Sequence, residues 1–141
     1  MKNTPVPQGN YIPASRYGNL IYTSGMTPRY NGVLMFKGKI EVSESIDSYR
    51  EAVRLAASNA LIAVRNSLKK DEFLEEIVTL TVYIAAEEGF QAHSQIADFA
   101  SEYLYEEIGK EGIGSRAAVG VSSLPGNAPV EIQIVAEVSH K

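Results

Sequence analysis

The chain has 141 residues, and its 13 Lys and Arg against 17 Asp and Glu give a formal net charge of −4. This length suits one domain with one hydrophobic core, which we assign to residues 1–141. The absence of Cys excludes a disulfide framework, a thiolate nucleophile and a Cys-based metal site. The acidic balance disfavours a sequence-blind nucleic-acid binder. Without a signal-like N-terminus or a membrane-length apolar run, we expect a cytoplasmic protein with no membrane partner.

The N-terminal quarter predicts an arm, a turn and a strand. Residues 1–10 contain two prolines and a glycine, and we expect an extended arm. Tyr11 to Pro13 are expected to form an edge strand or its approach, because proline cannot donate to a central ladder. The β-formers of Leu20 to Thr23 predict a strand after the Gly18-Asn19 turn signal. The small residues Ser24 and Gly25 would then let a backbone N–H approach a ligand closely.

The middle of the chain predicts a small hairpin and a long helix. An Asn31-Gly32 turn signal lies within residues 29–40, which we interpret as a loop with a short hairpin. Apolar residues then recur at helical spacing from Ser43 to Lys69, with Ser43 as the expected N-cap. The many alanines of this helix indicate close packing on a sheet.

A central strand and a second helix follow. We expect Lys69 to Glu72 to form a solvated turn, and Phe73 to Ile84 a strand that is partly buried on both faces. Its face made by Thr79, Thr81 and Tyr83 is a candidate subunit contact. A second helix is expected from Glu87 to Ile108, with His93 beside the core in a structural role. Residues 109–114 lack the Lys-Ser/Thr of a phosphate-binding loop, so we expect a flexible connector that closes over Arg116.

Two strands at the C-terminus contain the charged residues of greatest chemical interest. Alternation places Arg116 with Ala118 on one face of the first strand, and Glu131 on one face of the second. We expect both charged side chains to leave the same side of one sheet. An arginine offers a planar fork to a carboxylate, and a glutamate can position or deprotonate water. The order of elements predicts an α+β fold, with two helices on one face of a mixed sheet.

Two segments at opposite ends of the chain carry a resemblance to a known family. Residues 18–25, Gly-Asn-Leu-Ile-Tyr-Thr-Ser-Gly, and the segment from Arg116 through Leu124-Pro125 to Glu131 resemble the signatures of the Rid family, also called the YjgF family. The resemblance covers Tyr11 to Val138. It implies a chorismate-mutase-like fold, a homotrimer with sites between subunits, and hydrolysis of 2-imino acids and enamines to 2-keto acids and ammonia.

The resemblance also implies roles for individual residues. Arg116 would bind the substrate carboxylate and Glu131 would handle water and protons. Gly25 and Ala118 would contribute backbone N–H groups, and Tyr11 and Ser24 a wall and a hydroxyl. No metal or cofactor is implied, since an imine is already electrophilic.

Two departures from the family pattern keep alternatives open. Ala118 stands where well-studied deaminases of the family have Cys, and no Asn occurs between Asn66 and Asn127 to match the one on their second helix. Asp98 lies near that position, but an anion there would repel a carboxylate substrate. The alternatives are a protein that binds a small carboxylate metabolite without turnover, and the translation-inhibitor or endoribonuclease activity ascribed to some relatives. The substrate side chain stays undetermined.

Overall fold

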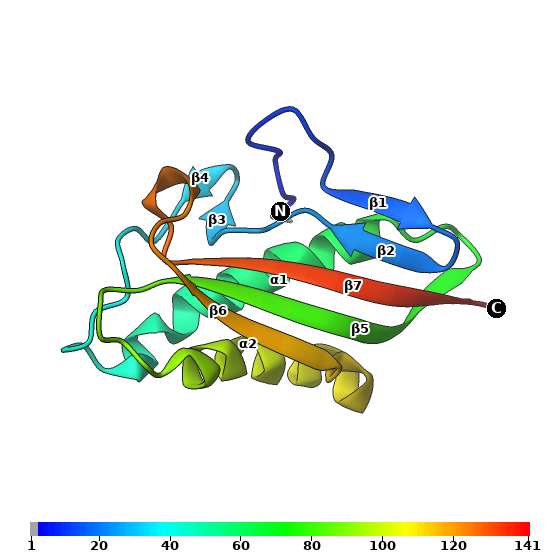
Figure 1. The fold of residues 1–141 in the computed structure, drawn as a ribbon. Coiled ribbons are helices and arrows are strands. Elements are labelled where there is room, and N and C mark those ends of the chain that lie inside the picture. The colour runs from blue at the N-terminus through cyan, green and yellow to red at the C-terminus, as the bar shows by residue number, and fades with distance from the viewer. Residues whose placement is uncertain (1–2) are drawn as a thin grey trace.

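The computed structural model describes residues 3–141, which form a five-stranded sheet with two helices on one of its faces (Figure 1). The strands lie in the order β1-β2-β7-β5-β6, and only the β5–β6 pair is parallel. This arrangement confirms the predicted α+β fold with a mixed sheet. The sheet strands are β1 (Ala14–Tyr17), β2 (Leu20–Thr23), β5 (Glu72–Ala85), β6 (Ser115–Val121) and β7 (Val130–His140). The helices are α1 (Arg50–Asn66) and α2 (His93–Ile108), with 3-10 turns η1 (Ile46–Tyr49), η2 (Gly109–Gly112) and η3 (Pro125–Asn127).

The core lies between the sheet and the two helices. Alternate residues of β7 and β5 point toward the helices and are buried, because side chains of a strand alternate between its faces. Helix α1 meets them with a stripe of small residues, which lets the helix axis come close to the sheet. The buried residues of this layer include Ala56, Ala57, Ala60, Leu80, Val82, Ile84, Ile132, Ile134 and Ala136. Among the described residues, no helix combines the length and the apolar composition that a membrane span needs.

The predicted hairpin is present, and its turn has the expected backbone. Strands β3 (Arg29–Tyr30) and β4 (Val33–Leu34) form a separate two-stranded sheet. The two turn residues between them, Asn31 and Gly32, have positive φ angles of 52° and 81°. Asn and Gly adopt this left-handed region at low cost, which is why the pair marks a tight hairpin.

Both helices begin later than the sequence pattern predicts. The helix expected from Ser43 begins at Arg50, because Tyr49 has a φ of −98° and a ψ of −1° that separates η1 from α1. The helix expected from Glu87 begins at His93. Gly89 has a φ of 93°, which ends any helix there, and the Glu87 N–H donates to Ile40 O at 2.9 Å. Residues 87–92 therefore connect β5 to α2 instead of extending the helix.

The turn expected to be solvated contains a buried carboxylate. Glu72 opens β5 with a side chain that is 3% exposed, and Arg16 of β1 donates to both of its oxygens at 2.8 and 2.9 Å. The Lys69 N–H adds a third bond at 2.9 Å. The prediction was wrong because an acidic residue beside two lysines resembles a surface turn in sequence, while its partner lies on a distant strand.

The glycine-rich connector, which was expected to be flexible, is closely packed. Residues Gly109–Gly112 form a 3-10 turn, and a Cβ on Gly112 would collide with the Leu104 carbonyl. A Cβ on Gly114 would collide with the Ile77 carbonyl of β5. These glycines thus allow backbone segments to touch, which is the opposite of a mobile connector.

The arm at the N-terminus runs without helix or strand over its described part, residues 3–10. Asn3 attaches it to the body of the molecule. Its Nδ2 donates to Asn59 Oδ1 at 2.6 Å and to Arg29 O at 3.1 Å. The buried Asn59 in turn donates to Thr27 O and Arg29 O, so the loop after β2 is fixed from two sides.

Candidate active site

The predicted site residues form two groups on opposite sides of the sheet. Glu131 follows the alternation of β7 onto the face without helices, and Tyr83 of β5 is its register partner. Arg116 lies opposite Leu80, whose side chain is buried on the helix face. The prediction that both charges leave one side of the sheet is therefore wrong. The alternation of charged and apolar residues in β6 suggested that Arg116 faces away from the helices. In the structure the face with Arg116 packs on α2, and Val119 on the other face is 38% exposed.

The first group forms around Glu131 at the start of β7. Met26 and Ile132 exchange two backbone hydrogen bonds of 2.7 and 2.8 Å, and this bridge places Gly25 beside Glu131. A Cβ on Gly25 would collide with the Glu131 carboxylate, so any larger residue here would displace that side chain. Glu131 is half-buried, and burial raises the pKa of its carboxyl above the ordinary value.

Ser24 and Tyr11 lie close to Gly25. The Ser24 hydroxyl donates to Ile12 O at 2.6 Å, so it fastens the segment before β1 to the end of β2. Tyr11 accepts a bond from the Gln8 N–H through its hydroxyl at 3.0 Å. Tyr11 and Gly25 both line a narrow cavity of about 30 Å³. This space suits a water molecule and is too small for an amino-acid-sized ligand.

The second group forms around Arg116, whose guanidinium bonds to α2. Its Nη1 donates to Asp98 Oδ1 at 2.8 Å and to Ser101 Oγ at 3.0 Å. Its Nη2 donates to Ser94 Oγ at 2.8 Å and to Ser94 O at 3.3 Å. Ala118, next on the same face of β6, packs half-buried against the core. Of the predicted residues, only Arg116 and Ala118 come together here.

A shallow pocket continues this face of β6 beyond Ala118. A Cβ on Gly120 would meet the His93 Nε2 at 2.6 Å, so the imidazole fills the space that glycine leaves. The His93 ring also meets the Phe90 ring edge-on, with centroids 5.2 Å apart. His93 therefore packs half-buried beside the core, as predicted. The pocket has a volume of about 450 Å³ and is also lined by Lys39 and Glu87.

The residues that hold Arg116 were missed by sequence reasoning, although a signal for them exists. Ser94, Asp98 and Ser101 have the i, i+4, i+7 spacing of one helix face. A polar stripe on a helix that borders an arginine strand predicts this contact. The sequence places Asp98 near the site but does not predict its pairing with Arg116.

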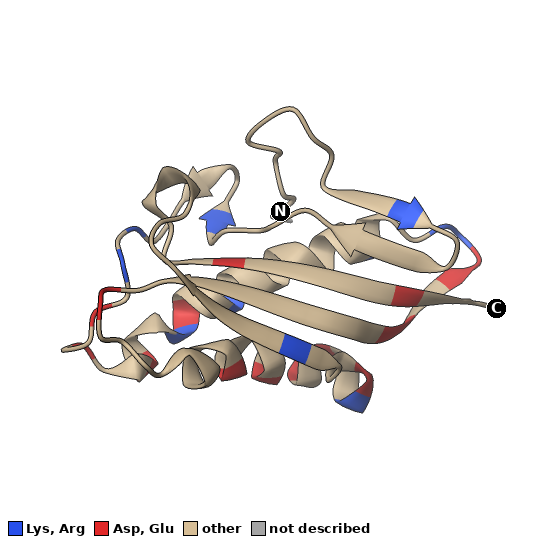
Figure 2. Cartoon of the chain, in the orientation of Figure 1, with Lys and Arg blue, Asp and Glu red and all other residues tan. Residues whose placement is uncertain are grey.

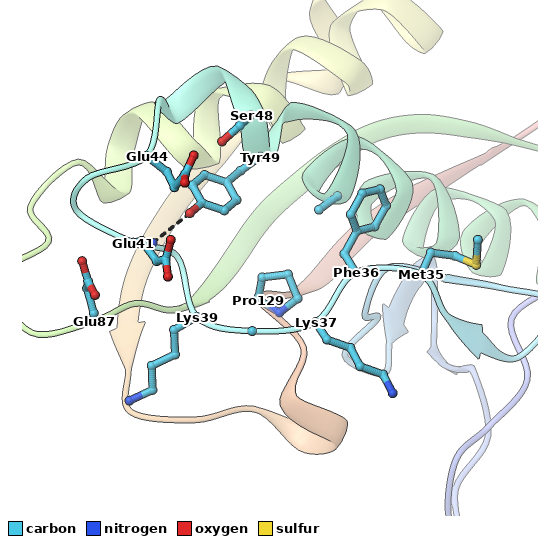
Figure 3. A pocket seen from close by; sticks show the side chains of 12 residues that line it. Met35, Phe36, Lys37, Lys39, Glu41, Glu44, Ser48, Tyr49, Glu87 and Pro129 are labelled. Carbon is cyan, nitrogen blue, oxygen red and sulfur yellow. Dashed lines mark hydrogen bonds between the residues drawn. The ribbon is translucent and has the colours of Figure 1, made fainter.

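A larger pocket lies away from both groups. It has a volume of about 600 Å³ and lies between the loop of residues 35–41, the start of α1 and Pro129 (Figure 3). The Glu41 N–H donates to the Tyr49 hydroxyl at 2.8 Å along its wall, and the Lys37 side chain points away from Tyr49. None of the predicted site residues lines it. Residues 3–141 also contain no group of three or more His, Asp or Glu that could hold a metal ion.

Comparison with known proteins agrees with the fold and the signatures. The model of the family Endoribonuclease L-PSP matches residues 1–138. A RutC family protein from Aquifex aeolicus is 31% identical over 133 residues, which cover 94% of this chain and 91% of that protein. The chain therefore belongs to the Endoribonuclease L-PSP family, the group that contains the YjgF and RutC proteins.

Solved structures of relatives have the same fold. A crystal structure of a protein of unknown function from Agrobacterium tumefaciens matches with a TM-score of 0.83 and 31% identity, over 95% of this chain and 86% of that one. The YjgF gene product of E. coli matches with a TM-score of 0.68 and 22% identity, over 96% and 93% of the two chains. The second likeness concerns the fold alone.

Proposed function

We propose that this protein hydrolyses reactive 2-imino acids and their enamine tautomers to 2-keto acids and ammonia. The observation that carries the proposal is the Glu131 carboxyl, which is half-buried beside Gly25 and has a pKa raised by burial. A carboxyl whose pKa is raised by burial holds its proton more readily, so it can both accept and return one, which is what general acid–base catalysis needs. The proposal includes a cytoplasmic location, where enzymes that use pyridoxal phosphate release such imines.

The reaction needs one water molecule and two proton transfers. The water oxygen attacks the imine carbon while Glu131 accepts a proton from that water, and the C=N bond becomes a C–N single bond. Glu131 then returns this proton to the nitrogen, which gives a carbinolamine with a hydroxyl and an amino group on one carbon. In the second transfer Glu131 accepts the hydroxyl proton and delivers it to the amino nitrogen, so the carbonyl forms as the C–N bond breaks and ammonia leaves. Arg116 holds the substrate carboxylate through its fork, a role that lysine fills less well. The imine itself is the electrophile.

One chain does not bring these two groups together, and this supports a site shared between copies. Arg116 projects on the helix side of β6, the edge strand, and Glu131 projects on the opposite face of β7. A second copy that packs against the first can place its Glu131 near the Arg116 of the first. We therefore include a homotrimer with sites between subunits in the proposal.

A second candidate function is binding of a carboxylate metabolite without turnover. The observation that favours it is the sequence of α2, which has no Asn to match the one that well-studied deaminases of the family use on their second helix. Cleavage of RNA, which the family name suggests, has less support. The outer surface of α2 is acidic (Figure 2), and His93 and His140 lie on separate elements. RNA degradation that persists in Arg116→Gln after careful purification would favour that third function.

The test is ammonia release from 2-imino acids generated in the assay, with semicarbazone trapping of the imine as a second readout. We expect Glu131→Gln to bind an unreactive 2-keto acid normally and to lose roughly 10²–10⁴-fold in turnover. Arg116→Lys keeps the charge but loses the fork, so we expect binding to weaken by roughly ten- to a hundredfold. If the parent protein binds the 2-keto acid but releases no ammonia, the binding function replaces the deaminase.

A further inference from the structure

Asp98 is the one acidic residue of α2 that contacts the sheet. The four acids of this helix are Asp98, Glu102, Glu106 and Glu107. The three glutamates pair with arginines of α1, namely Arg50, Arg54 and Arg65, at 3.3, 3.0 and 3.2 Å. Asp98 instead turns to β6 and accepts a hydrogen bond of 2.8 Å from Arg116.

We propose that Asp98 is an internal competitor for Arg116, occupying the place of a ligand carboxylate and lowering the affinity of the site for carboxylates. The inference rests on the proposed role of Arg116 as the carboxylate-binding group. Asp98 acts through Arg116 and is a specificity-determining residue, with no part in the bond-making steps.

The geometry favours an exchange of one carboxylate for another. Asp98 bonds to Nη1, while the two bonds from Nη2 go to Ser94. A ligand carboxylate that replaces Asp98 on Nη1 would therefore find the guanidinium already oriented by Ser94. The exchange replaces one charge-assisted hydrogen bond with another, so Arg116 is never left without an acceptor.

The exposure of both side chains makes the contact accessible to water and to a ligand. The Asp98 side chain is 54% exposed and that of Arg116 is 21% exposed. A partly exposed ion pair contributes little to stability, because water solvates the released carboxylate at low cost. The pair also leaves the site without net positive charge until a ligand arrives. Monoanions and zwitterions should therefore bind better than dianions, which would meet Asp98 as a second negative charge.

The test measures binding of pyruvate, an unreactive 2-keto acid, to the full chain by NMR of the arginine side-chain N–H groups. We expect Asp98→Asn to bind pyruvate about two- to fivefold more tightly, the range that fits loss of a partly exposed ion pair. Asp98→Glu keeps the anion and should keep the weaker binding. Glu102→Gln is the matched control, because it removes an α2 carboxylate that pairs with Arg50 and should leave the Kd unchanged.

The outcomes separate this inference from the proposed function. Equal or weaker pyruvate binding in Asp98→Asn, with binding abolished in Arg116→Gln, overturns the competitor and leaves the proposed role of Arg116 intact. Binding that does not depend on Arg116, or no binding in either the parent or Asp98→Asn, overturns both. If Asp98 only supported the fold, Asp98→Asn would lower Tm without tightening pyruvate binding.

Discussion

Glu131 combines two requirements that oppose each other. Proton transfer near neutral pH favours a carboxyl removed from water, and the packing of Gly25 against Glu131 provides that environment. The same burial penalises the ionised form, so the folded protein holds a charge that an unfolded chain would solvate better. The residue should therefore reduce stability at the pH where its charge is needed.

We predict that Glu131→Gln raises Tm at neutral pH. Because the pKa of the carboxyl is raised on folding, its penalty is absent below the ordinary glutamate value of 4.5 and fully present above the folded value. The gain in Tm should therefore shrink as the pH falls. Thermal melts from pH 4 to pH 8 measure this, and Glu137→Gln, on the same face of β7, is the control for loss of one charge. A gain that is constant across pH contradicts the assignment.

The sequence identifies Arg116 and Glu131 but does not determine how they lie relative to each other. Alternation tells which residues share a face within one strand. It cannot tell which face meets the helices when the side chains on both faces are small and mildly apolar. In β6 the face with Ala117 and Val119 is the more apolar one, yet the face with Arg116 and Ala118 packs toward the helices. The orientation of β6 depends on the hydrogen bonds of Arg116 to Ser94, Asp98 and Ser101, which lie on α2, a separate element of the chain.

At the scale of elements, Arg16 and Glu72 join two strands that are not neighbours. β1 is at one edge of the sheet, and β2 and β7 lie between it and β5. The pair therefore fastens the start of β5 to the edge hairpin, near the end of α1, where Arg16 also donates to Ser67 O. The Arg16 guanidinium is the main reason that the pKa of Glu72 falls to about 2.

We predict that the protein loses stability in acid through Glu72. A carboxyl with a lowered folded pKa stabilises fully above its ordinary value of 4.5, and this contribution is lost as the pH falls toward about 2. Chemical denaturation at pH 7 and at pH 3 measures the difference. Glu72→Gln should lower stability at pH 7 and flatten the pH dependence, whereas Asp71→Asn, on the exposed neighbouring residue, should do neither. Parallel curves for Glu72→Gln and the parent would contradict the role.

The elements themselves were largely predictable, and their ends were not. Strong periodicity predicted both helices and the strands of the C-terminal half. The starts of the helices depended on contacts outside the pattern, such as the bond between the Val42 N–H and Glu87 Oε1. Gly89 was the local signal for the later start of α2, since its positive φ interrupts any helix.

At the scale of the whole molecule, the sheet has one face without helices (Figure 1). Thr79, Thr81 and Tyr83 of β5 are half-buried on this face, and Tyr22 of β2 is 40% exposed. A large mixed face of this kind is suited to contact with another copy, and closed symmetry is the rule for homo-oligomers.

We predict a trimer built on this face. Light scattering at micromolar concentration should give about three times the chain mass of 15.4 kDa. Thr81→Lys places a charge at the middle of the face and should shift the mass toward that of one chain. Asn66→Lys, at the exposed end of α1, should not. A parent protein that is monomeric would remove both the trimer and the shared site.

The place of β7 in the sheet has a consequence for how the molecule folds. Among the described strands the ribosome makes β7 last, yet it lies between β2 and β5 and pairs with both. The β1–β2 hairpin therefore lacks its neighbour in the sheet until β7 emerges. Leu20 of β2, for example, pairs with Glu137, which is made near the end of synthesis. Such distant pairing slows folding. During synthesis, β2 and β5 expose unpaired edges that are open to aggregation, and we expect nascent chains that stop before residue 130 to need chaperone protection.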